Sequence, residues 1–340
     1  MIPKTGELTD AVSASTNVPP SKQQTPSIRN ESEHLLKWML ITADPEVARY
    51  AESCGVGRIF VDMEVMGKQE RQGHLDTHKA SHTLMDVARV RDVLTKAELM
   101  VRLNPLHEGS ADEIEGAIRN GADRLMLPMF RTPEEVRDFL WMVPVGIPVT
   151  LLVETPQALV RLPAYLPNLK SSDEIYFGLN DLSLGLDLQF LFEPLAGGLL
   201  DRPAIMLRER QIPFGFGGVA RLEGGELSAE RILGEHVRLG SSWVILSRAF
   251  HANAGLETPW ARQIDLDHEI GRLRKCERKW RAAGIEDLEL NRQHLVERVF
   301  SIAHQRGQFH GRTRVDPPNS VSPATPHAGT AATTRTGSTQ

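Results

Sequence analysis

The 340-residue sequence contains only two cysteines, Cys54 and Cys276, and their spacing fits neither a zinc-ligand pair nor a disulfide framework. It has no apolar run as long as the roughly 18 residues that a membrane span requires, and its N-terminus lacks a hydrophobic signal core. We therefore expect a soluble cytoplasmic protein whose thiols are reduced.

An excess of positive charge is missing as well. The formal net charge is -5 and the isoelectric point is near 6.2, so the composition gives no electrostatic argument for binding nucleic acid or an anionic membrane. Hydrophobic residues make up 41% of the chain and charged residues 24%, which suffices for a large core. The length favours one large α/β domain over several small domains.

Both ends of the sequence have a composition that is typical of disorder. Residues 1–30 are rich in Ser, Thr, Pro, Asn and Gln, and residues 308–340 are rich in Pro, Ser, Thr, Ala and Gly. We expect disordered tails there, a catalytic barrel domain over residues 31–255, and helices over residues 256–307.

Between the tails, short apolar runs alternate with amphipathic stretches, as in a parallel sheet covered by helices. The runs are residues 36–41, 58–62, 99–103, 124–127, 149–153, 174–178, 212–215 and 243–246. Eight such units predict a (β/α)8 TIM barrel, in which active sites lie at the carboxyl ends of the strands. Two further helical stretches, about residues 265–283 and 288–304, exceed what a barrel needs. We expect them to pack outside it or on a neighbouring subunit of a homo-oligomer.

Two acids follow adjacent predicted strands. Glu154 comes directly after the fifth apolar run and Asp181 shortly after the sixth, so both should project from the same rim of the barrel. Hard oxygen ligands gathered there suit a divalent cation such as Mg2+. The alternative is a pair of solvated acids at helix starts, because Thr155 and Pro156 resemble the opening of a helix.

The strand ends carry five short motifs in a fixed order. They are Asp62-Met63-Glu64, Val101-Arg102-Leu103-Asn104, Gly121-Ala122-Asp123 with Leu127-Pro128-Met129, Val153-Glu154-Thr155 and Gly178-Leu179-Asn180-Asp181-Leu182. This order and spacing resembles the HpcH/HpaI aldolase and citrate lyase beta-subunit family over roughly residues 35–255. The resemblance implies a magnesium- or manganese-dependent carbon-carbon lyase that works through an enolate.

The resemblance also implies roles for single residues. Glu154 and Asp181 match the family's metal ligands, and Arg102 matches the arginine that contacts the substrate. A 2-oxo acid chelates a hard cation through its carboxylate and keto oxygens, and a guanidinium beside it stabilises the enolate charge. We expect Asp62 to orient Arg102, and Glu64 to lie nearer the waters of the metal.

The sequence departs from the family at Val65. The aldolase branch carries a proton-transfer histidine there, and the citrate-lyase branch usually carries another acid. The replacement candidates are His74, which lies in the polar stretch 66–80 that has the composition of a mobile lid, Glu64 acting through a metal-bound water, and His107 or Glu108. We predict His74.

A glycine-rich segment follows the seventh predicted strand. Gly217 and Gly218 there, with Arg248 after the eighth strand, occupy the common phosphate site of barrels and predict binding of a substrate phosphate or second carboxylate. The alternative is that the glycines allow tight barrel corners.

These observations predict a metal-dependent aldolase that acts on a 2-oxo acid and an aldehyde, with Mg2+, Mn2+ or Co2+ as cofactor. The alternatives are an acyl-CoA lyase of the citrate or malyl type and a non-catalytic metabolite-binding barrel. A thioester substrate needs basic residues for its nucleotide phosphates, and the sequence contains no recognisable patch of this kind.

Overall fold

The structure is a computed structural model that describes residues 35–67, 82–250 and 265–311. The chain divides into two units, Met1–Leu35 and Leu36–Gln340, and every described helix and strand belongs to the second unit. His74, the predicted N-terminal tail and residues 312–340 lie outside the described residues. The predicted C-terminal tail begins too early, because residues 308–311 still belong to the last helix. In the part of the chain that is described, no helix combines the length and the apolar character that crossing a membrane requires.

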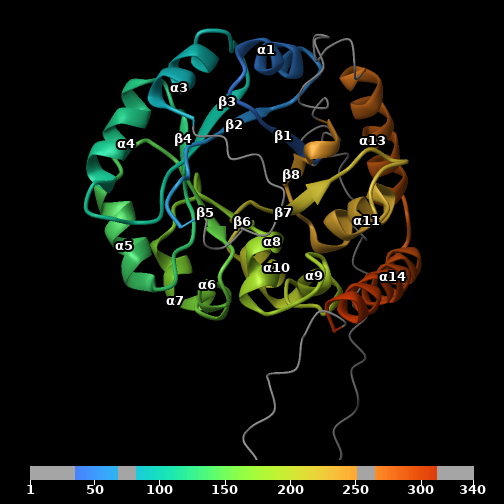
Figure 1. Cartoon of the computed structure of the whole chain (residues 1–340). Helices are drawn as coiled ribbons and strands as arrows, with labels where there is room; N and C mark the ends of the chain where they lie inside the picture. Colours follow the sequence, from blue (N-terminus) through green and yellow to red (C-terminus); the bar gives the residue numbers. More distant parts are fainter. Residues whose placement is uncertain (1–34, 68–81, 251–264, 312–340) are drawn as a thin grey trace, which may run out of the picture. The chain divides into compact units, whose positions relative to one another are not determined.

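Eight parallel strands close into a barrel in chain order, and β1 pairs with β8 (Figure 1). The strands are β1 (Lys37–Ile41), β2 (Arg58–Asp62), β3 (Glu98–Arg102), β4 (Arg124–Leu127), β5 (Val149–Val153), β6 (Glu174–Phe177), β7 (Phe214–Val219) and β8 (Trp243–Leu246). The predicted TIM barrel is confirmed. The seventh strand differs most from the prediction, because it runs from Phe214 to Val219 instead of from residue 212 to residue 215.

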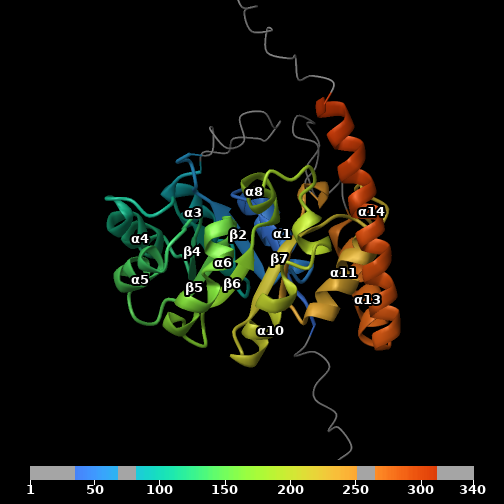
Figure 2. The ribbon, with the colours of Figure 1, turned by 90° about the horizontal axis from the view of Figure 1, so that it is seen from below.

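Helices cover the outside of the barrel (Figure 1). They are α1 (Pro45–Ser53), α3 (Leu84–Arg91), α4 (Ser110–Arg119), α5 (Pro133–Met142), α6 (Pro156–Val160), α7 (Leu162–Tyr165), α8 (Leu179–Gly185), α9 (Glu193–Ala196), α10 (Asp201–Glu209) and α11 (Ala229–Leu239), with 3-10 helices η2 (Leu166–Asn168) and η3 (Arg248–Phe250). Two long helices follow, α13 (Leu266–Arg281) and α14 (Ile285–Gly311). Both pack against α11 on the outside of the barrel (Figure 2).

The local sequence explains where these helices begin. Pro133 occupies the first turn of α5, where its missing N–H costs no hydrogen bond, and Thr132 and Glu135 form a capping box. The Asp44 carboxylate accepts the Glu46 N–H at 2.8 Å at the start of α1. Both α1 and α5 therefore start within a few residues of the strand before them.

Side chains that point into the barrel form three layers because they alternate along each strand. The middle layer is apolar and consists of Met39, Phe60, Met100, Met126, Leu152, Tyr176 and Trp243. The layer at the carboxyl ends contains Asp62, Arg102 and, just beyond β5, Glu154. A continuous apolar floor therefore separates the polar rim from the amino-terminal end of the barrel.

The amino-terminal layer is a buried ionic network. Arg58, which is 1% exposed, donates to both Glu174 carboxylate oxygens at 2.8 and 3.0 Å, and its Nε donates to Glu98 at 2.6 Å. Arg124 Nε donates to the other Glu98 oxygen at 2.8 Å, and the Arg58 guanidinium lies 3.6 Å from the centre of the Trp243 ring. Burial acts to lower the pKa of Arg58, but the two glutamates outweigh it and raise the pKa.

Candidate active site

Glu154 and Asp181 lie at the same rim, as predicted from their positions after adjacent strands. Glu154 directly follows β5 and is 2% exposed, whereas Asp181 is half-buried in the first turn of α8. Glu154 Oε1 accepts the backbone N–H of Met129 at 3.1 Å. Met129 has a φ of 55°, a left-handed conformation that typically costs a non-glycine residue about 1–3 kcal/mol. Backbone strain is therefore tolerated at the contact that holds Glu154.

Close packing also fixes Glu154 from the side of β6. A Cβ atom placed on Gly178 would lie 2.7 Å from the Glu154 Cβ and 2.9 Å from its Oε2. Only glycine leaves room for the carboxylate at this point, where the chain passes from β6 into α8.

The environment of Glu154 disfavours its negative charge. Burial is the largest cause, and the nearby charges of Asp181 and Glu64 add to it, so that the pKa of Glu154 rises to about 8. Arg102 and the Met129 N–H act in the opposite direction without compensating. A buried carboxylate with two acidic neighbours is a site where an added cation would be strongly stabilised.

Arg102 lies opposite, at the end of β3. Its Nε and Nη2 donate to the two carboxylate oxygens of Asp62 at 2.8 and 2.7 Å, and Nη2 lies 3.4 Å from Glu64 Oε2. This paired contact fixes the plane of the guanidinium. Burial acts to lower the pKa of Arg102, but Asp62 and Glu64 raise it well above its usual value. Arg102 is thus a permanent cation at the rim.

The backbone after Glu64 is anchored by Asn104, the last residue of the second motif. Asn104 Oδ1 accepts the N–H groups of Val65 and Met66 at 2.9 and 3.0 Å, and its Nδ2 donates to Glu113 at 2.8 Å. Val65 itself is 49% exposed. The side chain at this position therefore points out of the core, and the backbone hydrogen bond does not depend on its identity.

Two cavities open at the rim, and Glu154 and Asp181 line both. The first has a volume of about 190 Å³, contains Arg102 in its wall, and has an apolar floor formed by the middle layer of the barrel. The second has a volume of about 320 Å³ and is bounded by the chain after β4 and β5, including Arg131 and Gln157. The two carboxylates therefore lie where the two cavities adjoin, and each cavity could hold a small molecule.

Tyr176 is a site residue that the sequence analysis missed. Its hydroxyl is buried in the wall of the first cavity, donates to the Gly217 carbonyl at 2.7 Å and accepts the Ile245 N–H at 3.0 Å. Burial raises the pKa of Tyr176 well above its usual value, so the hydroxyl stays neutral. The inward alternation from Glu174 to Tyr176 to Gly178 was the signal that could have identified it.

Gly217 and Gly218 line the first cavity, but they lie within β7 rather than in a loop after it. Gly217 has a φ of 56°, and the pairing of β7 with β8 shifts register between Gly215 and Gly218. This irregularity turns the strand so that its last residues face the cavity. Arg248 begins η3 after β8, and its predicted role in binding an anion stays a prediction.

The proton-transfer candidates are placed differently. His107 Nδ1 accepts the Gly109 N–H at 3.0 Å, and its Nε2 lies 3.3 Å from Glu113, so the ring takes part in the start of α4. Neither His107 nor the exposed Glu108 lines a rim cavity. Glu64 is 2% exposed and contacts Arg102, and His74 lies outside the described residues.

The donor set at the rim suits a hard divalent cation. Within residues 35–67, 82–250 and 265–311, no group of three or more His, Cys, Asp and Glu side chains is arranged to hold a metal ion. Glu154 and Asp181 provide two carboxylates, and both side chains line the two rim cavities. Mg2+ is commonly bound by one or two carboxylates and completes its shell with water and substrate oxygens. The raised pKa of Glu154 agrees with a position at which a cation is needed.

Residues 40–190 match the family model of HpcH/HpaI aldolase/citrate lyase. A comparison with curated proteins gave no match. Among solved structures, the HpcH/HpaI aldolase from Desulfitobacterium hafniense DCB-2 aligns with a TM-score of 0.49 and 15% sequence identity, over 64% of this chain and 87% of that chain. The residues matched by the family model include Asp62, Arg102, Glu154 and Asp181. The stretch of the barrel from the end of β1 through α8 is thus similar to the HpcH/HpaI aldolase/citrate lyase family.

Proposed function

We propose that this protein is a divalent-metal-dependent aldolase, a carbon-carbon lyase that forms or cleaves a bond through the enolate of a 2-oxo acid such as pyruvate. The observation that carries the proposal is that Glu154 and Asp181 line both rim cavities, whereas Arg102 lines only the smaller one. The smaller cavity takes the 2-oxo acid and the larger one takes the aldehyde. The reacting carbon atoms then meet beside the two carboxylates.

Glu154 and Asp181 are the residues that would hold Mg2+, or Mn2+ or Co2+ in its place. When bound, such an ion acts as a Lewis acid on the keto oxygen of the 2-oxo acid and stabilises the enolate charge. The proposal is supported by the oxygen donor set and by the buried, electrostatically unfavourable position of Glu154.

The side chains of the chain bind and orient the substrate. Arg102 donates hydrogen bonds to the substrate carboxylate or the enolate oxygen, while Asp62 keeps the guanidinium plane in place. Phe60, Met126 and Leu152 in the cavity floor exclude water from the enolate.

In the cleavage direction, the bond between C3 and C4 of a 4-hydroxy-2-oxo acid breaks. A base removes the 4-hydroxyl proton, and the enolate regains a proton at C3. We propose His74 as the residue that moves these protons. Glu64, which lies beside Arg102, is the alternative and would act through a bound water.

Proton NMR of pyruvate in deuterated buffer tests the proposal. We expect loss of the methyl signal with enzyme and Mg2+, no loss in EDTA, and recovery when metal is added back. A parallel screen of 4-hydroxy-2-oxo acids should find retro-aldol turnover. If neither reaction occurs with Mg2+, Mn2+ or Co2+, the chain is better described as a metabolite-binding barrel. If citryl- or malyl-type acyl-CoA is cleaved instead, the chain is an acyl-CoA lyase.

A further inference from the structure

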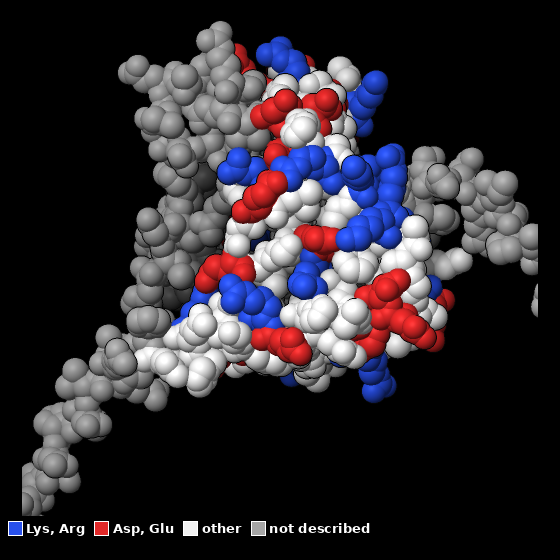
Figure 3. Space-filling view, turned by 90° about the vertical axis from the view of Figure 1, so that its right-hand side faces the viewer, with Lys and Arg blue, Asp and Glu red and all other residues white. Residues whose placement is uncertain are grey.

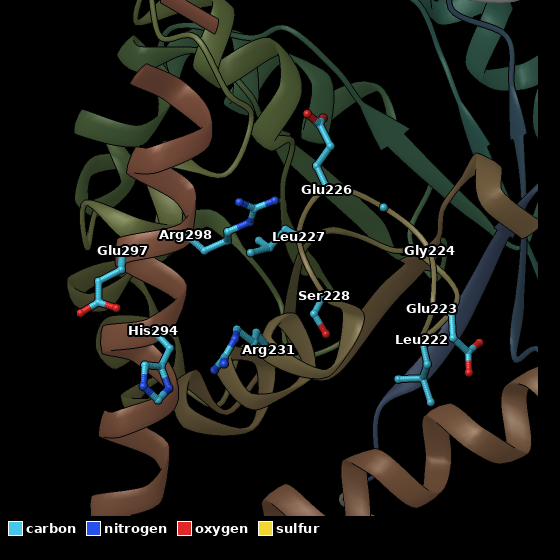
Figure 4. Close-up of a pocket in the computed structure, with 11 residues that line it drawn as sticks. Leu222, Glu223, Gly224, Glu226, Leu227, Ser228, Arg231, His294, Glu297 and Arg298 are labelled. Carbon is cyan, nitrogen blue, oxygen red and sulfur yellow. The ribbon is translucent and has the colours of Figure 1, made fainter. Parts of the chain in front are cut away.

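A further cavity lies away from the rim. It has a volume of about 570 Å³ and lies between the connection from β7 to α11 and the long C-terminal helix α14 (Figure 4). It shares no lining residue with either rim cavity. One of its walls is α14, which follows the eight barrel units and lies outside residues 40–190 that match the family model.

Three basic side chains face this cavity. Arg231 comes from the first turn of α11, and His294 and Arg298 come from successive turns of α14 (Figure 4). The two helices pack together, and Asn291 Nδ2 donates to the Arg231 carbonyl at 3.0 Å. Arg231 and His294 also line an adjoining cavity of about 380 Å³ between α13 and α14. Helix packing thus fixes the backbone positions from which the basic groups extend, and Arg231 and His294 are accessible from both cavities.

The acidic residues of the cavity do not neutralise these groups. Glu223 forms an ion pair with Arg272, and Glu226 forms one with Arg306, so both carboxylates are engaged with side chains outside the cavity lining. Glu297 leaves α14 in the opposite direction from Arg298 (Figure 4). Among the described residues, neither Arg231 nor Arg298 has a carboxylate within ion-pair distance.

The described surface near the cavity carries charges of both signs. On the face that carries α13 and α14, basic and acidic side chains are interspersed (Figure 3). The cavity also adjoins the N-terminus of α11, where the helix dipole favours a negative charge. Two guanidinium groups that line one cavity offer several N–H donors to an oxyanion with several acceptor oxygens.

We propose that this cavity is a second binding site, specific for a small ligand that carries a doubly charged oxyanion, either a phosphate or a pair of carboxylates. Arg231 and Arg298 hold the anion, and His294 donates an additional hydrogen bond. The connection from β7 to α11 joins this site to Gly217 and Gly218 in the wall of the small rim cavity. A ligand bound at this site would therefore contact the same connection that leads from the rim strand β7 to α11.

Isothermal titration of the full chain with inorganic phosphate and with malonate tests the site and distinguishes the two anion types. The buffer contains EDTA, so that no metal at Glu154 and Asp181 contributes, and the ionic strength is held constant with chloride. We expect saturable binding of at least one anion. Arg231→Gln and Arg298→Gln should each weaken it by about tenfold or more, because each removes charge-assisted hydrogen bonds.

Arg278→Gln is the matched control, since Arg278 is an exposed arginine of α13 that lines neither cavity. It removes the same charge and should leave binding unchanged. The proposal is overturned if neither anion saturates, or if Arg278→Gln weakens binding as much as the cavity variants do. Because Arg298 is exposed, we expect Arg298→Gln to fold like the parent, which circular dichroism checks. The proposal is also overturned if this folded variant binds the anions as tightly as the parent does.

Discussion

Replacing Arg102 with lysine tests whether the rim requires a guanidinium or only a positive charge. Arg102 holds both carboxylate oxygens of Asp62 at 2.8 and 2.7 Å and lies 3.4 Å from Glu64. A lysine ammonium carries all its donors on one nitrogen. It cannot span both Asp62 oxygens and also offer a planar pair of donors to a substrate carboxylate or enolate.

We expect kcat for pyruvate methyl-proton exchange and for retro-aldol cleavage to fall about 100- to 1,000-fold. This is the typical effect of losing one preorganised donor to a developing oxyanion, about 2.7–4 kcal/mol of transition-state stabilisation. The fold should survive, because a cation still faces Asp62 and Glu64. The free energy of unfolding, measured in urea by circular dichroism, should drop by only about 1–3 kcal/mol, the cost of an unmade buried hydrogen bond.

Arg119→Lys is the control for this experiment. Arg119 forms an exposed ion pair with Glu115 on α4, and the substitution there should change neither rate nor stability measurably. If the kcat of Arg102→Lys lies within about threefold of the parent value, the activation free energy differs by less than about 1 kcal/mol. Arg102 would then have no role in the mechanism. The prediction also fails if kcat per folded molecule is unchanged, so that the lower activity reflects only a smaller fraction of folded enzyme.

Four further predictions address the rim and one cysteine. Glu154→Gln and Asp181→Asn should abolish turnover and weaken Mn2+ binding in calorimetry while the fold remains, and unchanged Mn2+ affinity would refute the metal assignment. His74→Ala should slow pyruvate proton exchange by about 100- to 10,000-fold while hardly changing pyruvate affinity, and a parental exchange rate moves the base to Glu64. Gly178→Ala, which brings a Cβ to 2.7 Å from the Glu154 Cβ, should reduce turnover more than the thermal midpoint, and an equal effect on both would contradict a local role. Burial raises the pKa of the Cys276 thiol to about 11, so alkylation by iodoacetamide should be slow at pH 8 and accelerate toward pH 11, and rapid reaction at pH 8 would show that the thiol is exposed.

The sequence was sufficient to predict the barrel and the position of the rim acids. The run of residues 149–153 is buried at every position and apolar except for Thr150, because both faces of the strand are covered, and Glu154 directly after such a run has to lie at its carboxyl end. Arg102 was identifiable for the same reason, since a guanidinium at the end of an apolar strand requires a buried partner. The partner, Asp62, came from the neighbouring strand.

Three features could not be predicted in the same way. The glycines from Gly215 to Gly218 have the composition of a turn, but pairing with β8 and the positive φ of Gly217 keep them in a strand. Tyr176 was read as part of an apolar run, and its hydroxyl role depends on carbonyl and N–H groups from other strands. The proton-transfer residue depends on how the segment around His74 lies, which no local pattern determines.

The ionic network at the amino-terminal end of the barrel has a consequence for how the ring closes. Arg58 on β2 reaches Glu98 on β3 and Glu174 on β6, on the far side of the barrel. A slip of one residue in any of these strands would turn a charged group toward the apolar helices, so the network selects a single register among the possible ones. A fragment that ends before β6 would bury Arg58 without Glu174, which makes an isolated half-barrel unfavourable. The charges thus favour the complete eight-stranded domain over partial barrels, in which a buried charge would lack its partner.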